Sequence, residues 1–127
     1  AGCQAEIGVA GAMTAAAGAY LIDADVEKIE AAASLVLANL LGLTCDPVMG
    51  LVEVPCILRN GMITSMAFAA IELAGDNVKY TIPFDEVVEV VKNVGADMRS
   101  IYKETSQGGL AQTKTAQMAC HMCRRCG

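Results

Sequence analysis

The stretch AEIGVAGAMTAAAGAYL, residues 5–21, decides what kind of fold this sequence forms. Alanine is the best helix former, but each of the glycines Gly8, Gly11 and Gly18 weakens a helix by about 1 kcal/mol relative to alanine. A helix of this composition persists when it is buried, and glycines inside it allow neighbouring backbones to approach closely. The stretch therefore predicts an interior helix with tight contacts in an all-α fold.

The remainder of the chain is also predicted to be mostly helical. Apolar residues recur at spacings of three and four in three further segments, and each segment is expected to be a helix. The first covers residues 26–40 and can be capped by Asp23 or Asp25. The second covers residues 57–74, and the third runs from residue 84 towards residue 102. Residues 78–82 are expected to be extended. Aromatic residues make up only 4% of the chain, which argues against an all-β fold. We expect a compact helical bundle with Ala/Gly-rich core helices and a long loop at residues 43–55.

Charge and hydropathy narrow the class of protein. The net charge is −5, and no basic patch is present that could neutralise phosphates, so nucleic acid is not an expected partner. The longest apolar stretch, residues 7–22, is interrupted by glycine and threonine and is too short to span a bilayer. It also lacks the charged start of a signal peptide. We expect a cytoplasmic protein and, because the chain begins at Ala1 within core-like sequence, a fragment whose upstream part is missing.

The six cysteines fall into two sets that compete as metal ligands. In a cytosolic protein such cysteines are more often ligands or catalytic groups than disulfide partners. The first set, Cys3, Cys45 and Cys56, is far apart in sequence, and buried cysteine without a ligand role is the common alternative.

The second set forms a C-x2-C-x2-C run, which matches the first three positions of a ferredoxin-type ligand run. It consists of Cys120, Cys123 and Cys126. By local pattern alone, this run is the stronger signal.

Several short blocks follow one another along the chain: GCQAEIG at residues 2–8, GLTCDPV at 42–48, GLV at 50–52, VPCI at 54–57, RN at 59–60, GADM at 95–98, YKETS at 102–106 and GGLA at 108–111. In this order, they resemble the alpha chain of bacterial iron–sulfur-dependent L-serine dehydratases. The resemblance covers most of residues 2–111 and corresponds to the C-terminal portion of the family's alpha domain.

The resemblance implies a lyase that converts L-serine to pyruvate and ammonia, in amino-acid degradation and gluconeogenesis. It implies a 4Fe-4S cluster with Cys3, Cys45 and Cys56 on three of its irons. The fourth iron would be free to act as a Lewis acid on the β-hydroxyl of the substrate.

Further expectations concern the neighbourhood of these cysteines. Asp46, Arg59 and Asn60 flank two of the expected ligands and are candidates for supporting hydrogen bonds. Arg59 and Asn60 are also candidate substrate contacts, with a helix cap or salt bridge as the alternative role. The residues give no indication of the base that removes the α-proton.

The domain division expected from the resemblance is a cluster-binding portion at residues 1–111 and a cysteine-rich tail at residues 112–127. The fragment is expected to be inactive by itself. Its expected partners are L-serine, a beta domain or beta subunit, and further copies of the same chain. Cys126 is a possible additional ligand from the tail. One alternative is a small metal- or iron–sulfur-binding protein that uses the tail run and has no lyase activity. The other is a helical interaction module whose cysteines are merely buried.

Overall fold

Helices form all the regular structure in residues 1–76 and 79–123, the part of the chain that the computed structural model describes, and no strand occurs there. For residues 120–123 the backbone alone is described. The long helices are α1 (Cys3–Leu21), α2 (Val26–Asn39), α3 (Cys56–Gly75) and α4 (Phe84–Asp97). The shorter ones are η1 (Val48–Gly50), η2 (Ser100–Tyr102), η3 (Gly109–Gln112) and α5 (Lys114–Cys123). The predicted all-α bundle is confirmed.

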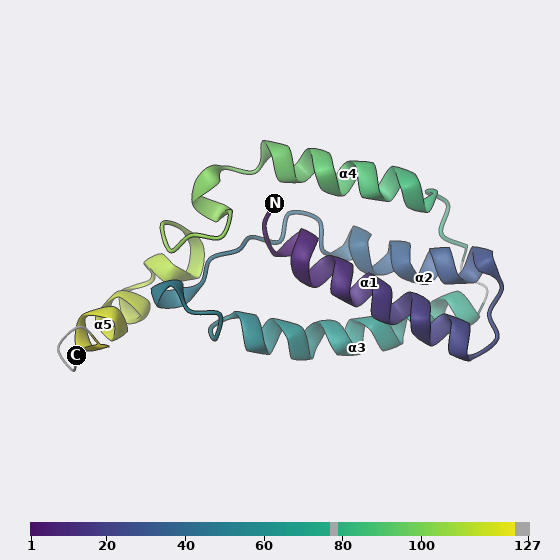
Figure 1. Ribbon diagram of the computed structural model, residues 1–127, viewed down its shortest axis with the longest axis horizontal. Helices are drawn as coiled ribbons and strands as arrows, with labels where there is room; N and C mark the ends of the chain where they lie inside the picture. Colours follow the sequence, from purple (N-terminus) through teal and green to yellow (C-terminus); the bar gives the residue numbers. More distant parts are fainter. Residues whose placement is uncertain (77–78, 124–127) are drawn as a thin grey trace.

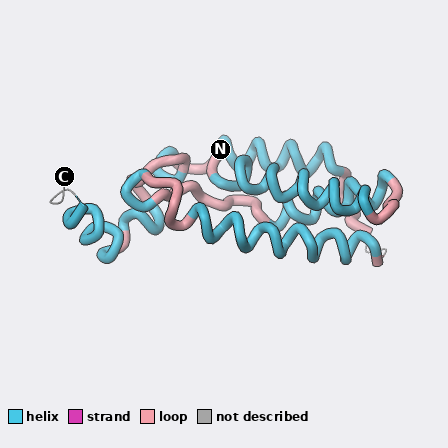
Figure 2. The backbone as a smooth tube through the Cα atoms, turned by 60° about the horizontal axis from the view of Figure 1, so that its bottom comes forward, coloured by secondary structure: helices cyan, strands magenta, loops and turns pink. Residues whose placement is uncertain are grey.

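The four long helices alternate in direction along the chain (Figure 1). Helices α1 and α3 run one way, and α2 and α4 run the other way. Helix α1 packs against α2 and α3, and α2 also packs against α3 and α4. Figures 1 and 2 place α5 beyond the bundle, at the end where α1 and α3 begin. The alternation therefore brings the N-termini of α1 and α3 to the same end of the bundle.

Small residues allow α1 to lie close to its neighbours. Ala12, Ala15 and Ala19 are buried on its inner face. A Cβ atom at Gly11 would lie 2.5 Å from Ile63 Cγ2 and 2.9 Å from Val36 Cγ1, so only glycine fits the observed spacing. The expected role of the glycines in close helix contact is confirmed at this position.

The helix boundaries agree with the sequence-based expectations in part. Asp25 caps α2, because its Oδ1 accepts a hydrogen bond from the Lys28 backbone N–H at 2.9 Å. Helix α4 ends at Asp97 and not near residue 102, because Met98 adopts extended backbone angles. This early end frees the following residues to reach the loop after α2, where the Cys45 N–H donates to Tyr102 O at 2.9 Å.

The structure adds detail to two other sequence-based expectations. Residues 79–82 form neither a helix nor a strand, and residue 78 of the expected extended piece lies outside the described part. The segment described from the sequence as a polar, cysteine-rich tail contains helix α5, which packs against η1 and η3.

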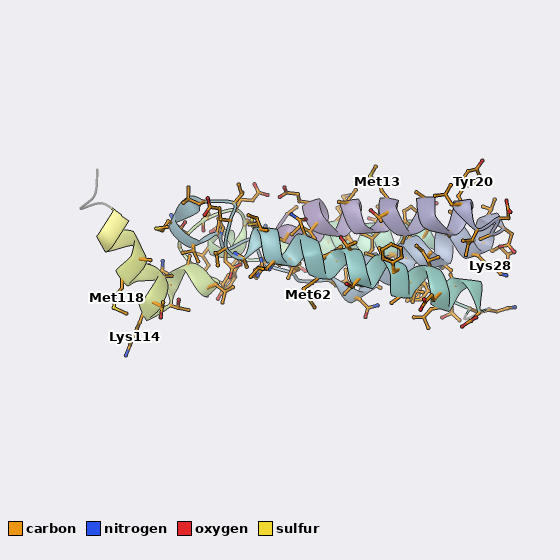
Figure 3. The ribbon with its side chains drawn as sticks, turned by 90° about the horizontal axis from the view of Figure 1, so that it is seen from below. Met13, Tyr20, Lys28, Met62, Lys114 and Met118 are labelled. Atoms are coloured by element: carbon orange, nitrogen blue, oxygen red, sulfur yellow. The ribbon has the colours of Figure 1, made fainter. Side chains whose placement is uncertain are left out.

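The outer faces of α1 and α3 are apolar. Met13 and Tyr20 on α1 and Met62 on α3 point away from the bundle (Figure 3), with 67%, 70% and 71% of their surfaces exposed. In addition, α3 is long and apolar enough to cross a membrane by length and composition, a property it shares with the core helices of soluble proteins. Its inner face, with Ile63, packs within the bundle.

Two glycine substitutions test the packing of α1. Gly11→Ala should lower the free energy of unfolding by about 1–3 kcal/mol, because the added methyl group meets the stiff, β-branched side chains of Ile63 and Val36. Gly61→Ala in α3 is the matched control, since a Cβ there meets nothing within 4 Å. It should raise stability by about 0.5–1 kcal/mol through helix propensity alone. Urea unfolding followed by circular dichroism measures both, and a stabilising Gly11→Ala would contradict the observed packing.

Candidate functional site

Three cysteines lie together at the end of the bundle where α1 and α3 begin. Cys3 is the first residue of α1, Cys56 is the first residue of α3, and Cys45 lies on the loop between α2 and α3. Cys3 and Cys45 are buried and Cys56 is half-buried. All three are free thiols. The structure thus brings together the cysteine set that sequence spacing favoured less.

The helix N-termini create a positive electrostatic environment for two of these thiols. Aligned peptide dipoles place roughly half a positive charge at the N-terminus of a helix. Cys3 and Cys56 begin helices of 19 and 20 residues, so both side chains lie at the positive end of a long helix.

Burial and mutual repulsion oppose ionisation when no cation is present. Burial raises the pKa of the Cys45 thiol from 9.0 to about 12, aided by a hydrogen bond with Cys3 and by the negative charges of Cys3, Cys56 and Glu104. Burial and the Cys3 charge also raise the pKa of Cys56, while Arg59 and a backbone hydrogen bond act in the opposite direction. Three thiolates at this site therefore need a positively charged group to neutralise them.

The segment that follows α4 holds the Cys45 loop in place. The Cys45 N–H donates to Tyr102 O at 2.9 Å, and the Glu104 N–H donates to Cys45 O at 3.1 Å. The Ser106 hydroxyl donates to Pro47 O at 2.9 Å. The backbone on both sides of Cys45 is thereby fixed by residues about 60 positions later in the chain.

A buried ion pair connects this loop to α3. Asp46 is only 3% exposed, and its Oδ1 lies 3.0 Å from Nη2 of Arg59. Among the described residues, no N–H is aligned with Oδ1 for a hydrogen bond, so the contact is an electrostatic one. Arg59 Nη1 donates to Thr44 O at 2.8 Å, and Asp46 Oδ2 accepts from the Leu110 N–H at 2.7 Å.

The two expected substrate contacts occupy different environments. Arg59 forms a salt bridge with Asp46 and donates a hydrogen bond to Thr44 O. A salt bridge was the alternative role expected for this residue. Asn60 is exposed at the side of α3. A substrate role for either residue stays a prediction.

Gln4 is a supporting residue that sequence reasoning missed. Its side chain is only 1% exposed, its Nε2 donates to Val91 O at 2.8 Å, and its Oε1 accepts from the Gly42 N–H at 2.9 Å. It therefore joins α4 and the start of the Cys45 loop to the helix that begins with Cys3. A polar residue directly after Cys3, within an apolar stretch, was the available signal.

The side chains of the tail cysteines are not among those that the structure describes. Cys120 and Cys123 lie in α5, where only their backbone is described, and Cys126 lies outside the described residues. Among the residues that are described, no three His, Cys, Asp or Glu side chains lie close enough to hold a single metal ion.

Comparisons with known proteins agree on one family. The family model described as serine dehydratase alpha chain matches residues 1–111. The chain is 45% identical over 116 residues to the "Probable L-serine dehydratase, alpha chain" of Bacillus subtilis, covering 91% of this chain and 39% of that protein. It is 47% identical over 116 residues to the "L-serine dehydratase, alpha chain" of Peptoniphilus asaccharolyticus, covering 91% and 40%. It is also 47% identical over 114 residues to the "L-serine dehydratase" of Helicobacter pylori, covering 89% and 25%. The chain thus spans two fifths or less of the length of these relatives.

The environment of Cys45 predicts slow alkylation of the metal-free protein. At a pH below 9.0, its thiolate fraction should be about three orders of magnitude lower than in an unfolded chain, because its pKa is raised to about 12. Iodoacetamide labelling followed by mass spectrometry should show slower modification in the folded protein than in urea. The rate in the folded protein should keep rising at pH values well above 9.0, where the rate in urea levels off. Identical pH profiles in the two states would contradict this environment.

Proposed function

The chain belongs to the serine dehydratase alpha chain family, and from this membership we propose that it is part of an L-serine dehydratase. The proposed reaction removes the β-hydroxyl and the α-proton of L-serine as water. The resulting aminoacrylate tautomerises and is hydrolysed to pyruvate and ammonia. Because the chain spans two fifths or less of its relatives, the complete reaction is assigned to a longer protein or assembly that contains this part.

We further propose that Cys3, Cys45 and Cys56 hold a 4Fe-4S cluster. The observation that carries this proposal is the gathering of three free thiols, from residues far apart in sequence, at the N-termini of two long helices. Thiolates are the ligands that iron–sulfur clusters take in proteins. The thiols are not close enough together for one ion, but each would bind a different iron of a cluster, so their sulfurs need not converge on a single point.

The chemistry that the cluster would supply is Lewis-acid assistance to the departing hydroxyl at an iron without a cysteine ligand. The chain's own residues serve this role by holding the ligands. The N-termini of α1 and α3 stabilise negative charge at Cys3 and Cys56. Burial of Cys3 and Cys45 keeps water away from two of the ligands.

The apolar outer faces of α1 and α3 support a partner for this part of the enzyme. Between Glu6 and Asp23 the α1 segment carries no charged residue, and α3 has only Arg59 before Glu72. The alpha chains of Bacillus subtilis and Peptoniphilus asaccharolyticus are more than twice as long as the part matched here. We propose that this additional alpha-chain sequence covers these faces in the complete enzyme, with a beta domain or subunit completing the assembly.

Anaerobic reconstitution with iron and sulfide tests the proposed ligands. Cys45→Ala should lose the bound iron and acid-labile sulfide and the brown cluster absorbance, because one of three ligands is gone. Cys123→Ala, a change of the same kind in the tail, should retain all three signals. Metal analysis and visible absorption spectra of the two variants and the parent protein provide the measurement.

The opposite result would favour the other candidate function. If Cys123→Ala loses the cluster and Cys45→Ala keeps it, the chain is a small metal- or iron–sulfur-binding protein that uses its tail. The reaction itself is tested in a full-length relative, where conversion of L-serine to pyruvate should disappear with the cysteine that corresponds to Cys45.

A further inference from the structure

We propose that Arg59 is a positioning residue that holds the three cysteine-bearing segments in a fixed arrangement. The inference rests on the proposed function, because it concerns the cysteines proposed as ligands. Arg59 lies three residues after Cys56 on α3, so the two side chains lie on the same side of the helix. Only 19% of the Arg59 side chain is exposed.

One guanidinium group contacts all three segments. Nη1 of Arg59 lies 3.6 Å from Cys3 Sγ, at the start of α1, and donates to it. The same nitrogen donates to Thr44 O, directly before Cys45, at 2.8 Å. Since Arg59 itself belongs to the helix that begins with Cys56, its side chain connects the three cysteines through one rigid, planar group.

Asp46 fixes the orientation of this group. It follows Cys45 directly, and its buried Oδ1 lies 3.0 Å from Nη2 of Arg59. Its second oxygen accepts from the Leu110 N–H at 2.7 Å. A Cβ atom at Gly109 would overlap the Asp46 carboxylate, and the φ angle of +60° at Gly109 also favours glycine. The carboxylate is therefore held between α3 and the first residues of η3.

These contacts need the several N–H donors of the Arg59 guanidinium group, and a positive charge alone would not make them. Arginine presents several N–H donors in one plane, whereas lysine presents a compact charge at the end of a flexible chain. A lysine at position 59 would keep the charge beside Cys3 but could not contact Thr44, Cys3 and Asp46 at the same time in the observed directions. Arg59→Lys therefore separates positioning from charge compensation.

The test uses the full chain with the tail cysteines changed to serine, so that only Cys3, Cys45 and Cys56 react. Two readouts are taken: loss of cluster absorbance after addition of an iron chelator, and fluorescence of the metal-free protein with dibromobimane. This reagent becomes fluorescent only when both its arms react with neighbouring thiols. Arg59→Lys should release the cluster about 10–100 times faster, as is typical when a group that orients metal ligands is removed. Its dibromobimane fluorescence should also fall.

Two further variants make the result specific. Arg99→Lys, the same change at an exposed arginine, should match the parent chain in both readouts. The double variant Arg59→Gln/Asp46→Asn leaves no unpaired buried charge, so it should keep its helical circular dichroism even if a single variant fails to fold. It should lose cluster retention and thiol cross-linking as Arg59→Lys does.

Each outcome decides the inference. If Arg59→Lys matches the parent chain in both readouts, or if it releases the cluster faster with unchanged cross-linking, Arg59 does not position the thiols. If the parent chain binds no cluster but cross-linking still falls in Arg59→Lys, the positioning role stands and the proposed cofactor is wrong. A parent chain that binds the cluster while Arg59→Lys is unaffected overturns this inference alone.

Discussion

The close packing of α1 against α2 and α3 determines where the cysteines at the helix N-termini lie. At Gly11 the side chains of Ile63 and Val36 occupy the space that any Cβ atom would need. Because α1 and α3 run in the same direction, this contact also sets the spacing of their first residues (Figure 1). A wider separation of the two helices would move Cys3 and Cys56 apart, and the loop that carries Cys45 would have no common site to complete.

The sequence predicted the parts of this arrangement that leave a periodic or compositional pattern. The glycines at residues 8, 11 and 18 indicated tight helix contacts, and the prolines at residues 47 and 55 indicated the loop between α2 and α3. Spacing alone favoured the tail cysteines, because three ligands on three distant segments have no local signature. Only the ordered blocks of the family directed attention to Cys3, Cys45 and Cys56.

The parts that sequence reasoning missed depend on contacts between distant segments. Gln4 joins α1, α4 and the Cys45 loop, and Asp46 is held by Arg59 and by the backbone of Leu110. A single buried polar residue has no periodicity, so its partners become visible only once the helices are placed. The early end of α4 has the same origin, since the backbone pairing of Tyr102 with Cys45 competes with continuation of the helix.

The dependence of the Cys45 loop on residues 102–110 imposes an order on biosynthesis. Cys3 leaves the ribosome first, but the hydrogen bonds from Glu104, Ser106 and Leu110 to its neighbouring loop need more than 100 further residues. Domains form as units when their contacting segments have all been synthesised. The three thiols therefore lack these contacts until residues 104–110 have been synthesised, and an inorganic cofactor at this site would have to be inserted after that point.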